Sequence, residues 1–154
     1  MIPGWEFNNS YDLMNEIIDK SNEIGGIDAL LIESHSTSNV LSIIQRADNG
    51  VGLWLTASDN WSGITFNDGA YIRFSGCNTG GNNGVAYYNS IAQQVANQTQ
   101  RIVWAFVNNS TQVGRDLQGN VVEHWRDAVS FRQEPVRMFW GQKLVPHYTQ
   151  FKPI

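Results

Sequence analysis

The sequence predicts an α/β fold with a mainly parallel sheet. Residues 27–34, 70–76 and 101–107 are short, apolar runs typical of strands buried on both faces. Amphipathic segments at residues 12–24 and 86–98 lie before and between these runs. Because crossovers usually join parallel strands, we expect one sheet with helices on its faces, a three-layer α/β/α arrangement.

The length and composition are those of one globular domain. The chain has 154 residues, enough to bury a core without disulfides or a metal. Hydrophobic residues make up 42% and charged residues 16%, which excludes the composition of a disordered chain. We expect residues 1–154 to form a single domain. Residues 111–154 are predicted to form a short, β-rich C-terminal tail packed on the core of this domain.

The first helix is predicted by apolar residues at helical spacing before a glycine pair. The apolar positions of residues 12–24 fall on one helical face: Leu13, Met14, Ile17, Ile18 and Ile24. Ser10 or Asp12 can cap the start, and Gly25-Gly26 ends the helix. The apolar run that follows at once predicts the first buried strand.

A β-hairpin is predicted after this strand. Residues 41–44 and 51–55 are short apolar runs on either side of the turn sequence Asp48-Asn49-Gly50. Residues 58–68 are polar and typical of a loop. The next strand then leads into a loop rich in Gly and Asn at residues 77–84, which precedes the second helix.

Charge and cysteine content exclude several classes of function. The formal net charge is −4, and the basic residues form no stripe, so we expect no nucleic-acid partner. No apolar run is long enough for a membrane span, and the N-terminus lacks the features of a signal peptide. We therefore expect no membrane partner and a soluble chain that is cytoplasmic, exported by a route that needs no N-terminal signal, or a piece of something larger. With one cysteine and no paired-ligand spacing, we expect no internal disulfide, metal site or cofactor.

Two predicted strands end in residues that are capable of chemistry. His35 follows the strand at residues 27–34, and Cys77 follows the strand at residues 70–76. In open parallel sheets, ligands bind beyond the carboxyl ends of the strands. The chain between them is long enough for a crossover. If the two strands are parallel neighbours, His35 and Cys77 lie side by side at one edge of the sheet.

An apolar strand ending in His, followed by one ending in Gly-Cys, resembles the caspase, gingipain, clostripain and separase group of cysteine peptidases. The run Ser75-Gly76-Cys77-Asn78-Thr79-Gly80 and the later helical segment SIAQQVA are similar to bacterial caspase-like domains of secreted or polymorphic-toxin proteins. The resemblance covers about residues 12–107. It implies a cysteine endopeptidase or related acyl-transfer hydrolase that acts on polypeptide substrates. For a toxin or effector domain it also implies a cognate inhibitor or immunity protein.

The resemblance implies a role for each matching residue. The thiolate of Cys77 attacks the carbonyl carbon, and His35 carries the proton to the leaving group. The backbone N–H groups of Ser36 and Cys77 hold the oxyanion. Ser75 and residues near Asn108 are the expected positions of the specificity pocket.

Two features of the sequence leave alternatives open. The family usually has Gly after the catalytic His, and here the residue is Ser36, so a catalytically silent caspase-like module for binding or assembly is one alternative. A papain-like hydrolase that uses Cys77 with His124 is another, with His147 a further rival base. Glu33 precedes His35 by two residues on the same strand face and is a candidate for orienting its imidazole ring, although the group needs no third member.

Overall fold

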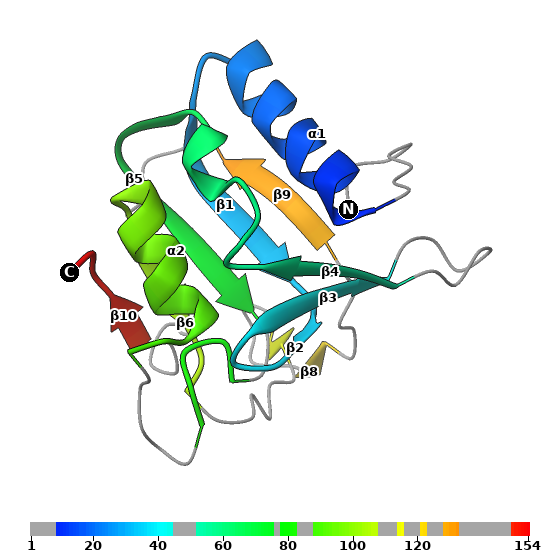
Figure 1. Cartoon of the computed structure of the whole chain (residues 1–154), viewed down its shortest axis with the longest axis vertical. Helices are drawn as coiled ribbons and strands as arrows, with labels where there is room; N and C mark the ends of the chain where they lie inside the picture. Colours follow the sequence, from blue (N-terminus) through cyan, green and yellow to red (C-terminus); the bar gives the residue numbers. More distant parts are fainter. Residues whose placement is uncertain are drawn as a thin grey trace.

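A five-stranded sheet is the centre of the fold. The computed structural model describes residues 9–44, 52–75, 78–82, 88–107, 114–115, 121–122, 128–132 and 149–154. The strand order is β10-β6-β5-β1-β9 (Figure 1). The three inner strands are parallel: β1 (Ile27–Glu33), β5 (Phe66–Ser75) and β6 (Ile102–Ala105). The predicted mainly parallel sheet with its three apolar strands is therefore confirmed.

Both helices begin at residues other than those predicted. Helix α1 (Ser10–Glu23) is capped by Asn9, whose side chain accepts a hydrogen bond from the amide of Asp12 at 2.9 Å. Ser10 and Asp12 are therefore not the cap. Helix α2 (Ile91–Thr99) begins well after residue 86, because Ser90 caps it and residues 88–90 form a turn.

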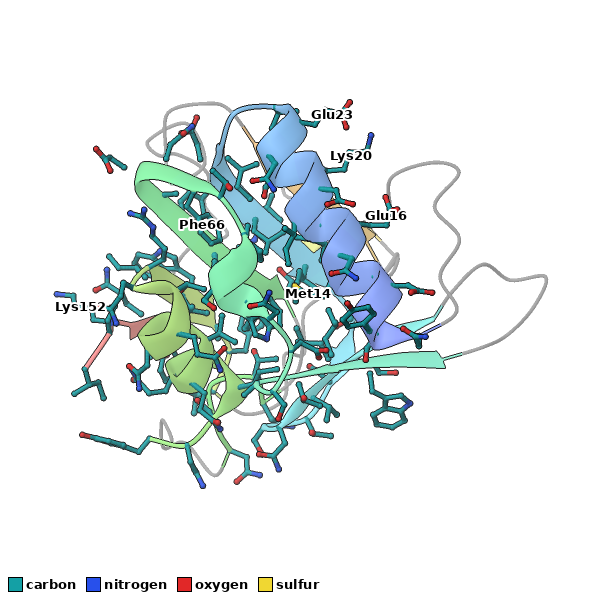
Figure 2. The ribbon with its side chains drawn as sticks, turned by 45° about the horizontal axis from the view of Figure 1, so that its top comes forward. Met14, Glu16, Lys20, Glu23, Phe66 and Lys152 are labelled. Atoms are coloured by element: carbon teal, nitrogen blue, oxygen red, sulfur yellow. The ribbon has the colours of Figure 1, made fainter. Side chains whose placement is uncertain are left out.

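The described helices cover one face of the sheet, in contrast to the expected layer on each face. The largest core cluster combines residues of both helices with one face of the inner strands. It includes Leu13, Met14 and Ile17 of α1, Ile91, Val95 and Ala96 of α2, and Leu30, Ile32, Ile72, Phe74 and Val103 of the sheet. Figure 2 shows Met14 pointing inward from α1, while Lys20 and Glu23 lie on its outer surface and form an ion pair at 3.0 Å.

The order of the strands explains why the β1–β5 connection and α2 share a face, whereas α1 precedes β1 and is held on this face by its apolar residues. From β1 to β5 to β6 the chain moves by one strand in the same direction across the sheet each time. Right-handed crossovers that step in one direction lie on the same face. The connection from β1 to β5 and the helix between β5 and β6 are therefore stacked on one side. In the part of the chain that the structure describes, the opposite face carries a smaller cluster of Ala29, Leu31 and Tyr71 with Trp104 packed against it.

The connection between β1 and β5 contains the predicted hairpin. Strands β2 (His35–Ser36), β3 (Val40–Ile44) and β4 (Gly52–Thr56) form an antiparallel sheet of their own. The predicted turn at residues 48–50 lies outside the described residues. The predicted loop at 58–68 instead contains a short 3-10 helix, η1 (Trp61–Gly63), and the start of β5. Trp61 is fully buried there, with its ring 5.6 Å from that of Phe74.

The C-terminal part forms short strands, two of which extend the main sheet. Strand β9 (Ala128–Arg132) pairs antiparallel with β1, and β10 (Thr149–Phe151) pairs antiparallel with β6. Strands β7 (Gly114–Arg115) and β8 (Val121–Val122) pair with each other. The described residues of the predicted β-rich tail therefore form short strands, and two of these are the edge strands of the sheet.

A buried serine joins α1 to the start of β5. The Oγ of Ser21, which is fully buried, donates to the carbonyl of Ile18 at 2.7 Å and accepts from the amide of Thr65 at 2.9 Å. The carbonyl of Ser21 also accepts from the amide of Gly26 at 2.8 Å. One side chain thus fixes the end of α1 against the segment that enters β5.

We predict that Ser21→Ala lowers the free energy of unfolding by about 0.5–1.5 kcal/mol, because the partly buried hydrogen bond from the amide of Thr65 is lost. Ser34 is the matched control, since it is 2% exposed and its Oγ has no hydrogen-bond partner in the structure as described. Ser34→Ala should leave the stability unchanged or raise it. Urea denaturation followed by circular dichroism measures both, and equal losses in the two variants would contradict this prediction.

Candidate functional site

The carboxyl ends of β1 and β5 lie next to each other. These strands pair in parallel through five consecutive positions, from Ala29 with Tyr71 to Glu33 with Ser75. Both strands therefore end at the same edge of the sheet, where parallel α/β sheets place their ligands. Figure 1 shows this edge close to the three-stranded sheet that contains β2.

The register of this pair relates the two residues of the predicted dyad. In every pair from Ala29 with Tyr71 to Glu33 with Ser75, the β5 residue follows the β1 residue by the same number of positions in the sequence. Cys77 follows His35 by this same number. His35 lies two positions after Glu33, at the start of β2. Cys77, Gly76 and Asn108 lie outside the described residues, as do His124 and His147. The structure therefore fixes the neighbouring strand ends, and the distance between the two side chains stays a prediction.

The backbone of the segment after β1 is held by β3. His35 pairs with Ser42, and Ser36 pairs with Leu41. The amide of Thr37 donates to the carbonyl of Val40 at 3.0 Å. Because hydrogen-bonded and non-hydrogen-bonded pairs alternate in an antiparallel ladder, the amide of Ser36 is directed away from β3. Ser36 has no positive φ, so serine fits the backbone conformation at this position.

The side chains near the end of β5 are small, polar and buried. Ser75, the expected pocket residue, is 6% exposed and is the register partner of Glu33. Thr79, in the segment that follows Cys77, is fully buried. Ser34, between Glu33 and His35, is also buried. The described part of this edge thus combines hydroxyl groups with the ends of two strands.

The segment after Cys77 is a tight turn fixed to the end of β6. Asn78 has a positive φ of 61°, and the amide of Gly81 donates to its carbonyl at 2.8 Å. The amide of Gly80 donates to the carbonyl of Phe106 at 2.8 Å. The Asn and Gly content of this loop therefore serves a specific turn, as expected from the preference of these residues for such conformations.

The start of α2 contacts the segments that follow both β1 and β5. The amide of Ile91 donates to the carbonyl of Ser38 at 2.8 Å, and the amide of Ala92 donates to the carbonyl of Thr79 at 3.1 Å. The amides of Gln93 and Gln94 donate to the Oγ of Ser90 at 3.3 Å and to its carbonyl at 3.0 Å. The first four amides of α2 all have protein acceptors, so this helix end is not an open anion site.

A capping pattern in the sequence marks the start of α2, which the apolar pattern alone does not predict correctly. Ser90-Ile91-Ala92-Gln93 matches the capping-box pattern of Ser or Thr followed three residues later by Glu or Gln. This pattern places the start of the helix, and hence the amides that contact the two strand-end segments. In the structure, the side chain of Gln93 instead donates to Asn97 at 3.0 Å and to the carbonyl of Lys152 at 2.7 Å.

Comparisons of the chain with protein-family models, curated proteins and solved structures give no match. Among the described residues there is no group of three or more His, Cys, Asp or Glu side chains that could hold a metal ion. No helix in the described ranges is long and apolar enough to cross a membrane.

Close packing at Gly80 gives a prediction about the loop that follows Cys77. A Cβ added at Gly80 would lie 2.5 Å from Cζ of Phe151 and 3.2 Å from the carbonyl oxygen of Phe106. Because Phe151 is buried in the core, Gly80→Ala should destabilise the protein by about 1–3 kcal/mol.

Thermal unfolding of Gly80→Ala, Phe151→Leu and the double variant measures this contact as a double-mutant cycle. The smaller side chain at residue 151 should make Gly80→Ala less damaging. Additive effects of the two substitutions would show that the contact does not limit this position.

Proposed function

We propose that this chain is a caspase-like cysteine hydrolase that cleaves polypeptides by acyl transfer, with His35 and Cys77 as its dyad. The observation that carries the proposal is the parallel pairing of β1 with β5. His35 and Cys77 share the separation of the residues paired between these strands. The pairing ends at Glu33 and Ser75, so His35 and Cys77 each follow a paired strand end by two positions, at the edge where ligands bind in such sheets.

The proposed reaction follows from the chemistry of a thiolate beside an imidazole. The Cys77 sulfur attacks the carbonyl carbon of the scissile bond and forms a tetrahedral oxyanion. As the C–N bond breaks, His35 donates its proton to the leaving amine, and a thioester remains on Cys77. Water then attacks the thioester while His35 accepts a proton from it, which releases the carboxylic acid and returns the Cys77 thiolate beside a protonated His35.

The oxyanion requires hydrogen-bond donors directed toward the substrate. The first-turn amides of α2 donate to carbonyls and to Ser90, so they cannot serve this purpose. The amides of Ser36 and Cys77 are the proposed donors, and the β2–β3 ladder directs the former away from β3. Each such donor is typically worth about 2.7–4 kcal/mol of transition-state stabilisation.

A catalytically silent caspase-like module is the second candidate, because Ser36 stands where the family usually has glycine. In that case Cys77 would react as an ordinary thiol. A further candidate is a papain-like site that pairs Cys77 with His124. The three candidates differ in how the reactivity of Cys77 depends on His35.

We predict that Cys77→Ala and His35→Ala each lower peptide cleavage by about a thousandfold or more, as expected when one member of a catalytic unit is removed. His124→Ala and His147→Ala are the matched controls and should retain activity. A proteome-derived peptide library, with mass spectrometric detection of new termini, measures cleavage at any peptide sequence that the protein accepts. Full activity in His35→Ala together with loss in His124→Ala would favour the papain-like site.

Alkylation by iodoacetamide tests the same dyad without a substrate. At pH 6 an imidazolium beside the sulfur favours the reactive thiolate, so Cys77 should react about tenfold faster in the wild type than in His35→Ala. Equal rates in the two proteins, together with an absence of cleavage, would favour the silent module.

A further inference from the structure

We infer that the first turn of α2 is the positioning element of the proposed dyad, because its first two amides hold the segments that follow His35 and Cys77. The inference rests on the proposed function and adds a role for Ser90, Ile91 and Ala92 in it. None of these residues is proposed to touch the substrate. Their role is to fix the separation of the two strand-end segments.

The contacts that carry the inference come from consecutive amides. Ile91 donates to the carbonyl of Ser38, three residues after His35, at 2.8 Å. Ala92 donates to the carbonyl of Thr79, two residues after Cys77, at 3.1 Å. Since adjacent Cα atoms of a trans peptide are about 3.8 Å apart, the two segments are held within a short, fixed distance of each other.

The described sheet pairing alone does not extend as far as the dyad. The last described pair between β1 and β5 is Glu33 with Ser75, two positions before His35 and Cys77. Beyond this pair the chain after β1 enters a separate sheet through β2. The hydrogen bonds to α2 join the two segments after the strands diverge.

The first turn of α2 is itself rigidly placed. Ser90 is 1% exposed, and its Oγ and carbonyl accept from the next turn of the helix. Ile91 and Ala92 are fully buried in the core cluster. The two acceptor segments are also pre-formed, because Oγ1 of Thr37 accepts from the amides of Asn39 and Val40, and the amide of Gly80 donates to Phe106. A displacement of the helix start would thus move both segments.

The rate of a catalysed reaction falls steeply when a catalytic group is misplaced, by about a hundredfold for a displacement of 1 Å. Removal of the Ser90 cap should therefore slow the His35-dependent reaction of Cys77. Removal of a cap elsewhere should lower the stability without slowing this reaction. Asn9→Ala is the matched control for Ser90→Ala, because Asn9 caps α1 through the same kind of hydrogen bond, to the amide of Asp12.

The experiment measures the rate of Cys77 alkylation by iodoacetamide from pH 5.5 to 9 in five proteins: the wild type, His35→Gln, Ser90→Ala, Ser90→Thr and Asn9→Ala. Both alanine variants should lower Tm. Ser90→Ala alone should lose most of the His35-dependent rate at pH 6, about tenfold. At pH 9, where a thiol ionises without help, its rate should equal that of the wild type. Ser90→Thr retains the hydroxyl and should restore the rate at pH 6.

The outcomes separate this inference from the proposed function. Equal alkylation rates in the wild type and in His35→Gln would contradict the proposed dyad, and with it the positioning role. A His35-dependent rate that survives in Ser90→Ala would overturn the positioning role and leave the dyad intact.

If Ser90→Ala does not fold, Ala92→Pro is the second variant, because proline is tolerated in the first helical turn but lacks the amide that donates to Thr79. Tyr11→Pro, at the second position of α1, is its control. The inference is supported if Ala92→Pro loses the His35-dependent alkylation rate while Tyr11→Pro keeps it. It is overturned if the two proline variants have the same His35-dependent alkylation rate, whether kept or lost.

Discussion

The parallel ladder between β1 and β5 is the constraint on which the rest of the structure depends. Its register places Leu30 and Ile32 beside Ile72 and Phe74 on the face that both helices cover. A shift by one residue would turn the apolar side chains of a strand to the opposite face, so burial fixes the register. The same register aligns Glu33 with Ser75 at the carboxyl edge. Core packing and the geometry of the proposed site therefore share one cause.

The direction of the crossovers transmits this constraint to α2. Because the chain steps from β1 to β5 to β6 in one direction, both connections lie on one face. The helix that joins β5 to β6 then starts at the carboxyl edge, beside the segments that follow β1 and β5. Its first amides need acceptors, since unsatisfied buried amides are costly, and the carbonyls of Ser38 and Thr79 supply two of them. The helix end thus organises the edge without being open to a ligand.

Local pattern is sufficient to predict the three inner strands and the hairpin, but not the features that depend on contacts distant in sequence. The apolar runs at residues 27–34 and 101–107 are buried because they form inner strands. The apolar residues before Ser90 extend the helical pattern and predict too early a start for α2, although the capping pattern marks the correct position. Among the described elements, the β1–β5 connection and α2 share a face because of the strand order, which no local pattern contains. The edge strands β9 and β10 depend on pairing with strands far along the chain.

For the candidate site, the sequence predicts strand ends capable of chemistry, and the structure adds that β1 and β5 are adjacent and parallel. The central claim, that His35 and Cys77 are neighbours, can be measured directly because Cys77 is the only cysteine in the chain. The His35→Cys variant should form an intramolecular disulfide with Cys77 under mild oxidation, since such a bond needs Cα atoms about 4.4–6.8 Å apart. Alkylation before and after reduction, followed by intact-mass measurement, detects this bond. We expect closure in His35→Cys and none in His124→Cys; a reduced His35→Cys protein beside a closed His124→Cys protein would contradict the claim.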